Sequence, residues 1–109
     1  MDNEQLIIKG RENVLKDKSY HFALKIISLC QRLQAENEYI LSRQLLRSGT
    51  SVGALIEEAN QAESRADFIH KLSIANKEAN ESKYWIRLLI DSKIIELKND
   101  EGLLTDCVE

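Results

Sequence analysis

The chain has 109 residues, of which 43% are hydrophobic and 30% are charged, and it contains no proline. This length suits one domain, and the many leucines and isoleucines exclude an intrinsically disordered chain. Lys and Arg number 15 against 18 Asp and Glu, so the net charge of −3 disfavours binding of polyanions through bulk positive charge. The start Met1–Gln5 is acidic and polar, and no apolar run is long enough to span a membrane, so we expect a cytoplasmic protein.

Residues 1–18 are polar, and we expect them to form a loosely attached lead-in to a single domain over residues 19–109. The first helix of this domain is predicted at about 19–36. Its apolar residues recur at three- and four-residue steps between Phe22 and Leu33, which is typical of one helix face. The absence of proline allows long helices throughout the chain.

A second helix is predicted at about 39–62, because small and aliphatic residues recur at alternating intervals of four and three. These seam residues are Leu41, Leu45, Ser48, Val52, Leu55, Ala59 and Ala62. Gly49 and Gly53 lie within the same helix, where each glycine costs about 1 kcal/mol relative to alanine. Either they form a groove that receives another helix, for example from a neighbouring subunit, or they mark a bend or break.

A third helix is predicted at about 65–91. Ser64 is a candidate N-cap, since Asp67 follows three residues later in an approximation to a capping box. This helix has a seam of the same spacing: Phe68, Leu72, Ala75, Ala79, Ser82, Ile86 and Leu89. Because only about two residues separate the second and third helices, they must form an antiparallel hairpin, which brings Ser48 close to Ser82.

The residues after the third helix are expected to cover one end of the bundle. Ile94, Ile95 and Leu97 are predicted to hold a loop against that end. A fourth helix, containing apolar residues such as Leu103, is predicted at about 100–109, and it is either short or truncated. The predicted fold is therefore all-α, an antiparallel up-and-down four-helix bundle.

Two runs within residues 41–89 resemble a known family. The first is QLLRSGTSVGA at residues 44–54, and the second is ADFIHKL at residues 66–72, which the pair Tyr84 and Trp85 follows. This combination resembles the four-helix bundle proteins that are also known as 23S ribosomal RNA intervening-sequence proteins. The family commonly has asparagine where this chain has leucine after the Gly-Ala pair, so no role of that asparagine is carried over.

The resemblance implies an antiparallel four-helix bundle that assembles as a ring-shaped homopentamer and has no enzymatic activity. A more distant similarity is to a retroelement accessory protein, which binds nucleic acid and accompanies a reverse transcriptase. The leucine that this chain has in place of the family's asparagine is Leu55. The residues that we single out as the structural motif of this chain are Arg47, Ser48, Gly49, Gly53, Glu58, Glu81 and Trp85.

Arg47 lies one residue from the seam of the second helix, and the hairpin brings it close to Glu78 and Glu81. We favour a partly buried ion pair between the helices, because an arginine removed from water usually has a carboxylate partner. The alternative is an anion site that Arg47 forms with Arg43, one helical turn away.

Three other patterns have ordinary structural explanations. Glu58 either faces water or pairs with His70 or Lys71 across the hairpin turn. Asp67 and His70 have the carboxylate-x-x-His spacing of di-metal bundles, but the chain has only two histidines, and we expect no metal or other cofactor. Trp85 lies beside the seam, where it packs either at the core edge or at a subunit boundary.

These patterns lead to two functional hypotheses, and neither includes a catalytic residue. The first is a non-enzymatic, homo-oligomeric helical bundle that acts as a scaffold or protein-binding module. The alternative is a nucleic-acid-binding accessory factor associated with RNA or a reverse transcriptase. Its candidate contacts are Arg43, Arg47, Lys83 and Arg87. Affinity for structured RNA with a steep salt dependence would favour this alternative.

Overall fold

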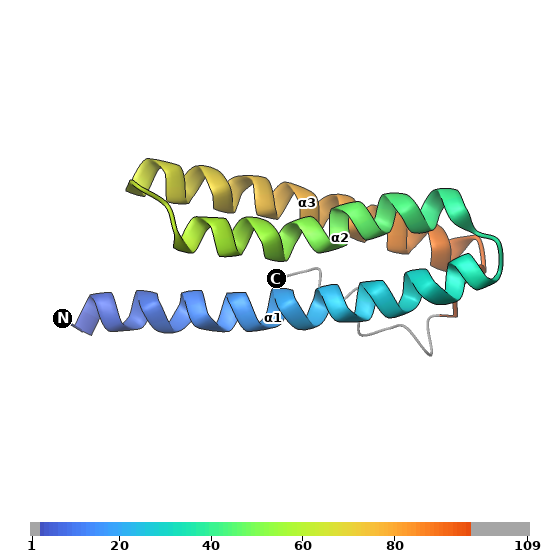
Figure 1. Cartoon of the computed structure of the whole chain (residues 1–109), viewed down its shortest axis with the longest axis horizontal. Helices are drawn as coiled ribbons and strands as arrows, with labels where there is room; N and C mark the ends of the chain where they lie inside the picture. Colours follow the sequence, from blue (N-terminus) through green and yellow to red (C-terminus); the bar gives the residue numbers. More distant parts are fainter. Residues whose placement is uncertain (1–2, 97–109) are drawn as a thin grey trace.

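The computed structural model describes residues 3–96, which form three α-helices with no strand among them (Figure 1). Helix α1 spans Asn3–Ala35, α2 spans Tyr39–Asn60 and α3 spans Arg65–Asp91. The prediction of an all-α chain is confirmed for this part of the sequence. The fourth helix, predicted at 100–109, lies outside the described residues.

Helix α1 is longer than the sequence pattern predicts. The predicted start near residue 19 is wrong, because the helix begins at Asn3 and runs without interruption to Ala35. Lysine, glutamate and leucine are strong helix formers, so the residues of the predicted lead-in favour a helical backbone by themselves. The side chains from 13 to 18 are all exposed. The division of the chain into a lead-in and a domain stays a prediction.

Helices α2 and α3 form the predicted antiparallel hairpin (Figure 1). The first of them ends at Asn60 rather than at residue 62, and α3 has the bounds that the sequence predicts. Ser64 caps α3, since its side-chain oxygen accepts a hydrogen bond of 3.1 Å from the N–H of Asp67. The chain therefore reverses direction where the sequence places the turn.

The main hydrophobic core joins all three helices and the segment after α3. Its buried members are Phe22, Ile26, Leu29, Cys30, Leu33, Leu45, Ile86, Leu89 and Ile95. Ile94 packs against this core, so the predicted contact of the loop with the bundle is confirmed for Ile94 and Ile95, whereas Leu97 lies outside the described residues. A second, smaller cluster consists of Val52, Ile56 and Ala75.

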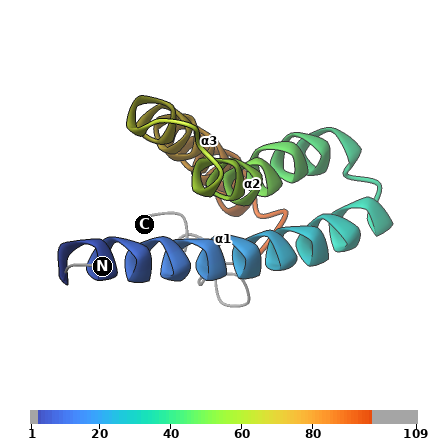
Figure 2. The same cartoon turned by 60° about the vertical axis from the view of Figure 1, so that its left-hand side comes forward.

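Helices α1 and α3 lie on two sides of α2 and diverge from each other. Helix α1 packs on α2, but its backbone does not come close to that of α3 (Figure 2). Among the described residues, α1 therefore covers only part of the apolar face of the α2–α3 hairpin.

Candidate functional site

The two glycines of α2 allow α1 to pack closely. A Cβ atom at Gly49 would lie 2.9 Å from both Cγ1 and Cγ2 of Ile26. A Cβ atom at Gly53 would lie 3.4 Å from the backbone carbonyl oxygen of Ser19. The predicted groove therefore receives α1 of the same chain. Of the alternatives, a break is wrong because α2 is one continuous helix, and a bend at the glycines stays a prediction.

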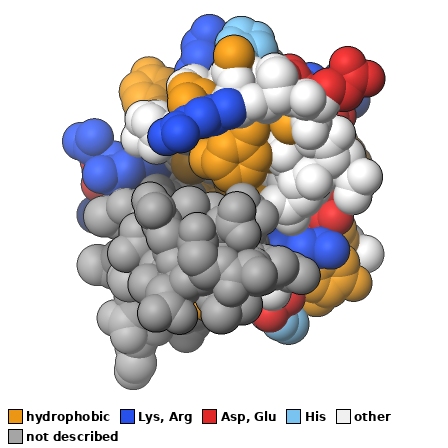
Figure 3. Space-filling view, turned by 90° about the vertical axis from the view of Figure 1, so that its left-hand side faces the viewer, with side chains coloured by type: hydrophobic (Ala, Val, Ile, Leu, Met, Phe, Trp, Pro, Cys, Tyr) orange, Lys and Arg blue, Asp and Glu red, His pale blue; other side chains and the backbone are white. Residues whose placement is uncertain are grey.

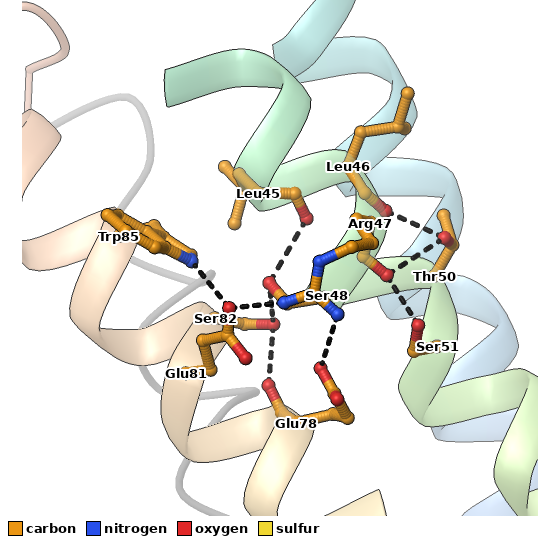
Figure 4. A network of polar contacts seen from close by, with 10 residues as sticks. All are labelled: Leu45, Leu46, Arg47, Ser48, Thr50, Ser51, Glu78, Glu81, Ser82 and Trp85. Carbon is orange, nitrogen blue, oxygen red and sulfur yellow. Dashed lines mark hydrogen bonds and ion pairs between the residues drawn. The ribbon is translucent and has the colours of Figure 1, made fainter. Parts of the chain in front are cut away.

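Arg47 connects α2 to α3 through two carboxylates (Figure 4). Its Nη1 lies 3.3 Å from Oε2 of Glu78, and its Nη2 contacts Oε1 of Glu81. The predicted ion pair between the helices is confirmed, although 51% of the Arg47 side chain stays exposed. Because two carboxylates already balance its charge, Arg47 attracts a further anion only weakly.

Trp85 extends this network toward the core. Its Nε1–H donates a hydrogen bond of 3.3 Å to Oε1 of Glu81, and its side chain packs against the main core. The hydrogen bond from Arg47 lowers the pKa of the Glu81 carboxyl below its ordinary value, and the bond from Trp85 lowers it further. The same contact with Glu81 raises the pKa of the Arg47 guanidinium. The carboxylate is thus held in its charged form between two donors.

Next to this ion pair, two serines make a buried polar contact between α2 and α3 (Figure 4). Ser48 and Ser82 have no exposed surface, and the Ser82 hydroxyl donates to the Ser48 hydroxyl at 2.9 Å. The single hydroxyl proton of Ser82 is shared with the Glu78 carbonyl, 2.9 Å away on its own helix, and the Ser48 hydroxyl donates to the Leu45 carbonyl at 3.4 Å. The predicted proximity of the two serines is confirmed.

The remaining basic residues of the nucleic-acid hypothesis lie on the same two helices. Arg43 on α2 and Arg87 on α3 are exposed, whereas Lys83 is partly buried. The carboxylates of Glu78 and Glu81 hold the fourth, Arg47, in ion pairs. The charge of Arg47 is therefore balanced by carboxylates of the opposite helix, and a role of the four residues in binding nucleic acid stays a prediction.

Glu58 takes one of its two predicted alternatives, an ion pair of 3.1 Å between its Oε2 and Nζ of Lys71. Among the side chains that the structure describes, Asp67 and His70 are not part of a group of three or more His, Cys, Asp or Glu that could hold a metal ion. Within the same residues, no helix combines the length and apolar character that crossing a membrane requires.

An open hollow lies between α1 and α3, with α2 as its floor. It has a volume of about 390 Å³, and its lining is mostly apolar: Phe22, Val52, Ile56, Leu72, Ala75 and Ala79. On the α1 side it is bordered by Lys18, His21 and Lys25. In a view from the end where α1 begins, apolar side chains are visible with basic side chains beside them (Figure 3). The sequence analysis identified Val52, Leu72, Ala75 and Ala79 as seam residues, but it did not predict the hollow that they line between the described helices.

The outer face of α1 has an apolar stripe that the sequence analysis did not separate from the core. Tyr20, Leu24 and Ile27 are exposed by 60%, 47% and 39%. They share one helix face because their spacing is i, i+4 and i+7. The core residues Phe22 and Ile26 lie on the opposite face, since two positions rotate a helix by about 200°. We define Tyr20, Leu24 and Ile27 as the α1 stripe.

These features define a class of small all-α protein, a helical hairpin tied by a central arginine and packed on a long first helix. The model of the family "23S rRNA-intervening sequence protein" matches residues 11–109, and the chain belongs to this family. It is also similar to a crystal structure from Bacteroides thetaiotaomicron VPI-5482, described as a protein with unknown function from the S23 ribosomal protein family. The TM-score is 0.85 and the identity 51%, over 89% of this chain and 88% of that chain. No curated protein matches this chain.

Proposed function

We propose that this protein is a non-enzymatic helical scaffold that assembles with copies of itself in the cytoplasm. The α1 stripe is the observation that supports this proposal. Single exposed apolar residues are normal in monomers, but Tyr20, Leu24 and Ile27 are all exposed and their spacing places them along one helix face. Burial of such a surface against a second copy is favourable by about 25 cal/mol for each Å² of apolar area.

The expected number of copies is five, and this number comes from the resemblance to the four-helix bundle proteins. A ring requires that the α1 stripe of one copy meets a different surface of the next copy. Contact between two α1 stripes would instead produce a two-fold dimer. The mass of the assembly therefore distinguishes the two modes of contact.

Light scattering of the full-length chain after gel filtration measures that mass. We expect several times the chain mass of 12.5 kDa, and we expect the double variant Leu24→Asp, Ile27→Asp to run as a monomer with unchanged helical circular dichroism. The matched control Ser73→Asp, Asn80→Asp places two carboxylates at exposed positions of α3 and should leave the mass unchanged. A wild-type chain that is monomeric at high concentration would contradict the proposal.

Binding of structured RNA by the same full-length chain tests the alternative function. The double variant Arg43→Glu, Arg87→Glu reverses the charge at the two exposed basic positions and leaves the ion pairs of Arg47 in place. The scaffold proposal expects no specific affinity at physiological salt. Affinity that falls steeply with salt, and that this variant abolishes, would support a nucleic-acid-binding accessory factor instead.

A further inference from the structure

The first turns of α1 project past the hairpin. Nζ of Lys16 lies 3.5 Å from Oε2 of Glu57, and α2 ends three residues later at Asn60. Because the two helices are antiparallel, α2 ends at about the level of residue 13 of α1. Residues 3–12 of α1 therefore extend past the end of α2 (Figure 1).

The sequence of this projecting part places an acidic, a basic and two apolar residues on one side of the helix. These residues are spaced at i, i+3, i+4 and i+7, and they are Glu4, Ile7, Ile8 and Arg11. From Ile8 the same side continues in steps of seven residues to Phe22, a member of the main core. The side of α1 that packs on the hairpin thus continues beyond the point at which α2 ends.

The charges on this side are self-complementary when two copies run antiparallel. If Glu4 of one copy is placed opposite Arg11 of a second copy, Ile7 falls opposite Ile8, and two-fold symmetry repeats both relations. Two ion pairs then flank an apolar centre. A parallel arrangement would place each charge opposite its own kind, which is unfavourable.

The projecting length agrees with the overlap that this register requires. The overlap from residue 4 to residue 11 covers about 11 Å at the helical rise of 1.5 Å per residue. In this register the end of α2 of one copy falls just outside the start of the other copy's α1 at Asn3. Two copies can therefore overlap along this segment without a clash between α1 and the opposite hairpin.

One such contact is too small to hold two single chains together. Specific interfaces bury more than about 1,000 Å² in total, and two overlapping helix ends of about two turns each bury less. A ring whose axis runs along the helices presents several α1 starts in the same direction. Several contacts then form together, and their combined strength far exceeds that of one contact.

We propose that residues 4–11 of α1 join two rings of this chain face to face, each segment antiparallel to its counterpart in the second ring. The inference rests on the proposed function, since a single chain lacks the multiple contacts. It uses a surface distinct from the α1 stripe, which begins at Tyr20. Residues 3–10 also precede the range 11–109 that the family model matches, so the family supplies no expectation for them.

Light scattering of the full-length chain measures the joining of two rings as a doubling of mass. Glu4→Lys and Arg11→Glu each place like charges opposite each other, and each variant should have half the mass of the unsubstituted assembly with unchanged helical circular dichroism. The double variant reverses both charges and should regain the full mass. The matched controls Glu36→Lys and Arg87→Glu make the same charge changes at exposed positions of α1 and α3 and should keep the full mass.

Mixing the two single variants tests whether the contact joins different rings. A ring of Glu4→Lys chains and a ring of Arg11→Glu chains have opposite charges at every contact, because the substituted lysine meets the substituted glutamate. We expect the mixture to regain the full mass that each variant alone has lost.

The possible failures of the two proposals are distinguishable. An assembly whose mass stays the same in both single variants would overturn the joining of rings and leave self-assembly through the α1 stripe intact. A mixture that keeps half the mass would overturn it as well. A chain that is monomeric before any substitution would contradict the proposed function itself, and with it the rings that this contact joins.

Discussion

Ser82 donates a hydrogen bond to Ser48 across the α2–α3 interface, and neither side chain has any exposed surface. The other hydrogen bonds described between α2 and α3 are the exposed ones of Arg47 and Lys71, so the serine pair is the contact of this interface that joins two fully buried side chains. A shift of α3 by one helical turn would place each hydroxyl against an apolar neighbour. The pair therefore favours a single register of the hairpin.

Replacement of either serine by alanine should lower the free energy of unfolding by about 1 kcal/mol, the usual net value of a buried hydrogen bond. The remaining hydroxyl keeps its backbone acceptor, Glu78 for Ser82 or Leu45 for Ser48, which limits the loss. The double variant Ser48→Ala, Ser82→Ala should lose less than the sum of the two single variants. Urea denaturation of all four proteins measures this coupling, and strictly additive values would refute it.

Arg47→Met should destabilise the protein by about 0.5–1 kcal/mol. The side chain is half exposed, and exposed ion pairs contribute no more than this even with two carboxylate partners. The substitution also leaves Glu78 and Glu81 close together without a cation between them. Arg43→Met, at an exposed position one turn earlier, serves as the control and should have almost no effect on the urea midpoint.

The same ion pair predicts an acid-sensitive stability. Arg47 lowers the pKa of Glu81 in the folded chain below the ordinary glutamate value of 4.5, so the unfolded chain binds more protons in the window just below that pH. Stability therefore rises with pH through this window, is fully present above it, and is lost as the pH falls through the folded pKa. Arg47→Met should flatten this part of the curve. Thermal melts of both proteins between pH 3 and pH 6 provide the measurement, and identical slopes would contradict the assignment.

Gly49→Ala and Gly53→Ala should have opposite signs. A methyl group at Gly49 would lie 2.9 Å from two carbons of the fully buried Ile26, and the overpacking should cost about 1–3 kcal/mol. At Gly53 the nearest atom, the carbonyl oxygen of Ser19, is 3.4 Å away, so the gain in helix propensity of up to about 1 kcal/mol should prevail. Denaturant midpoints compare the two variants directly, and equal effects would show that α1 does not pack as described.

The hairpin was predictable because its determinants are local. Ser64 caps α3 through a residue three positions away, and the seams that meet at Ser48 and Ser82 repeat every seven residues. The start of α1 was not predictable. The residues before Ser19 are helix formers that continue the helix, but their apolar residues show no helical period that would mark it. Ile27 shows a second limit, since periodicity marks an apolar residue as helical without indicating whether core or water faces it.

The sequence likewise predicted one part of the candidate site, the partners of Arg47, and not the other, the hollow. The partners of Arg47 follow from the antiparallel pairing, so sequence reasoning found Glu78 and Glu81. The hollow beside Phe22 depends on how far α1 and α3 diverge, and that angle results from packing of the whole molecule. The spacing of residues in the sequence does not predict this angle.

The approach of α1 to Gly49 has an evolutionary consequence. The distance between the two helices is set by the absence of one methyl group, because Ile26 already occupies the space that a side chain at residue 49 would need. We therefore expect these two positions to vary together in homologous proteins. A homologue that has alanine or serine in place of Gly49 is expected to have a smaller residue in place of Ile26, or a first helix that lies farther from the hairpin.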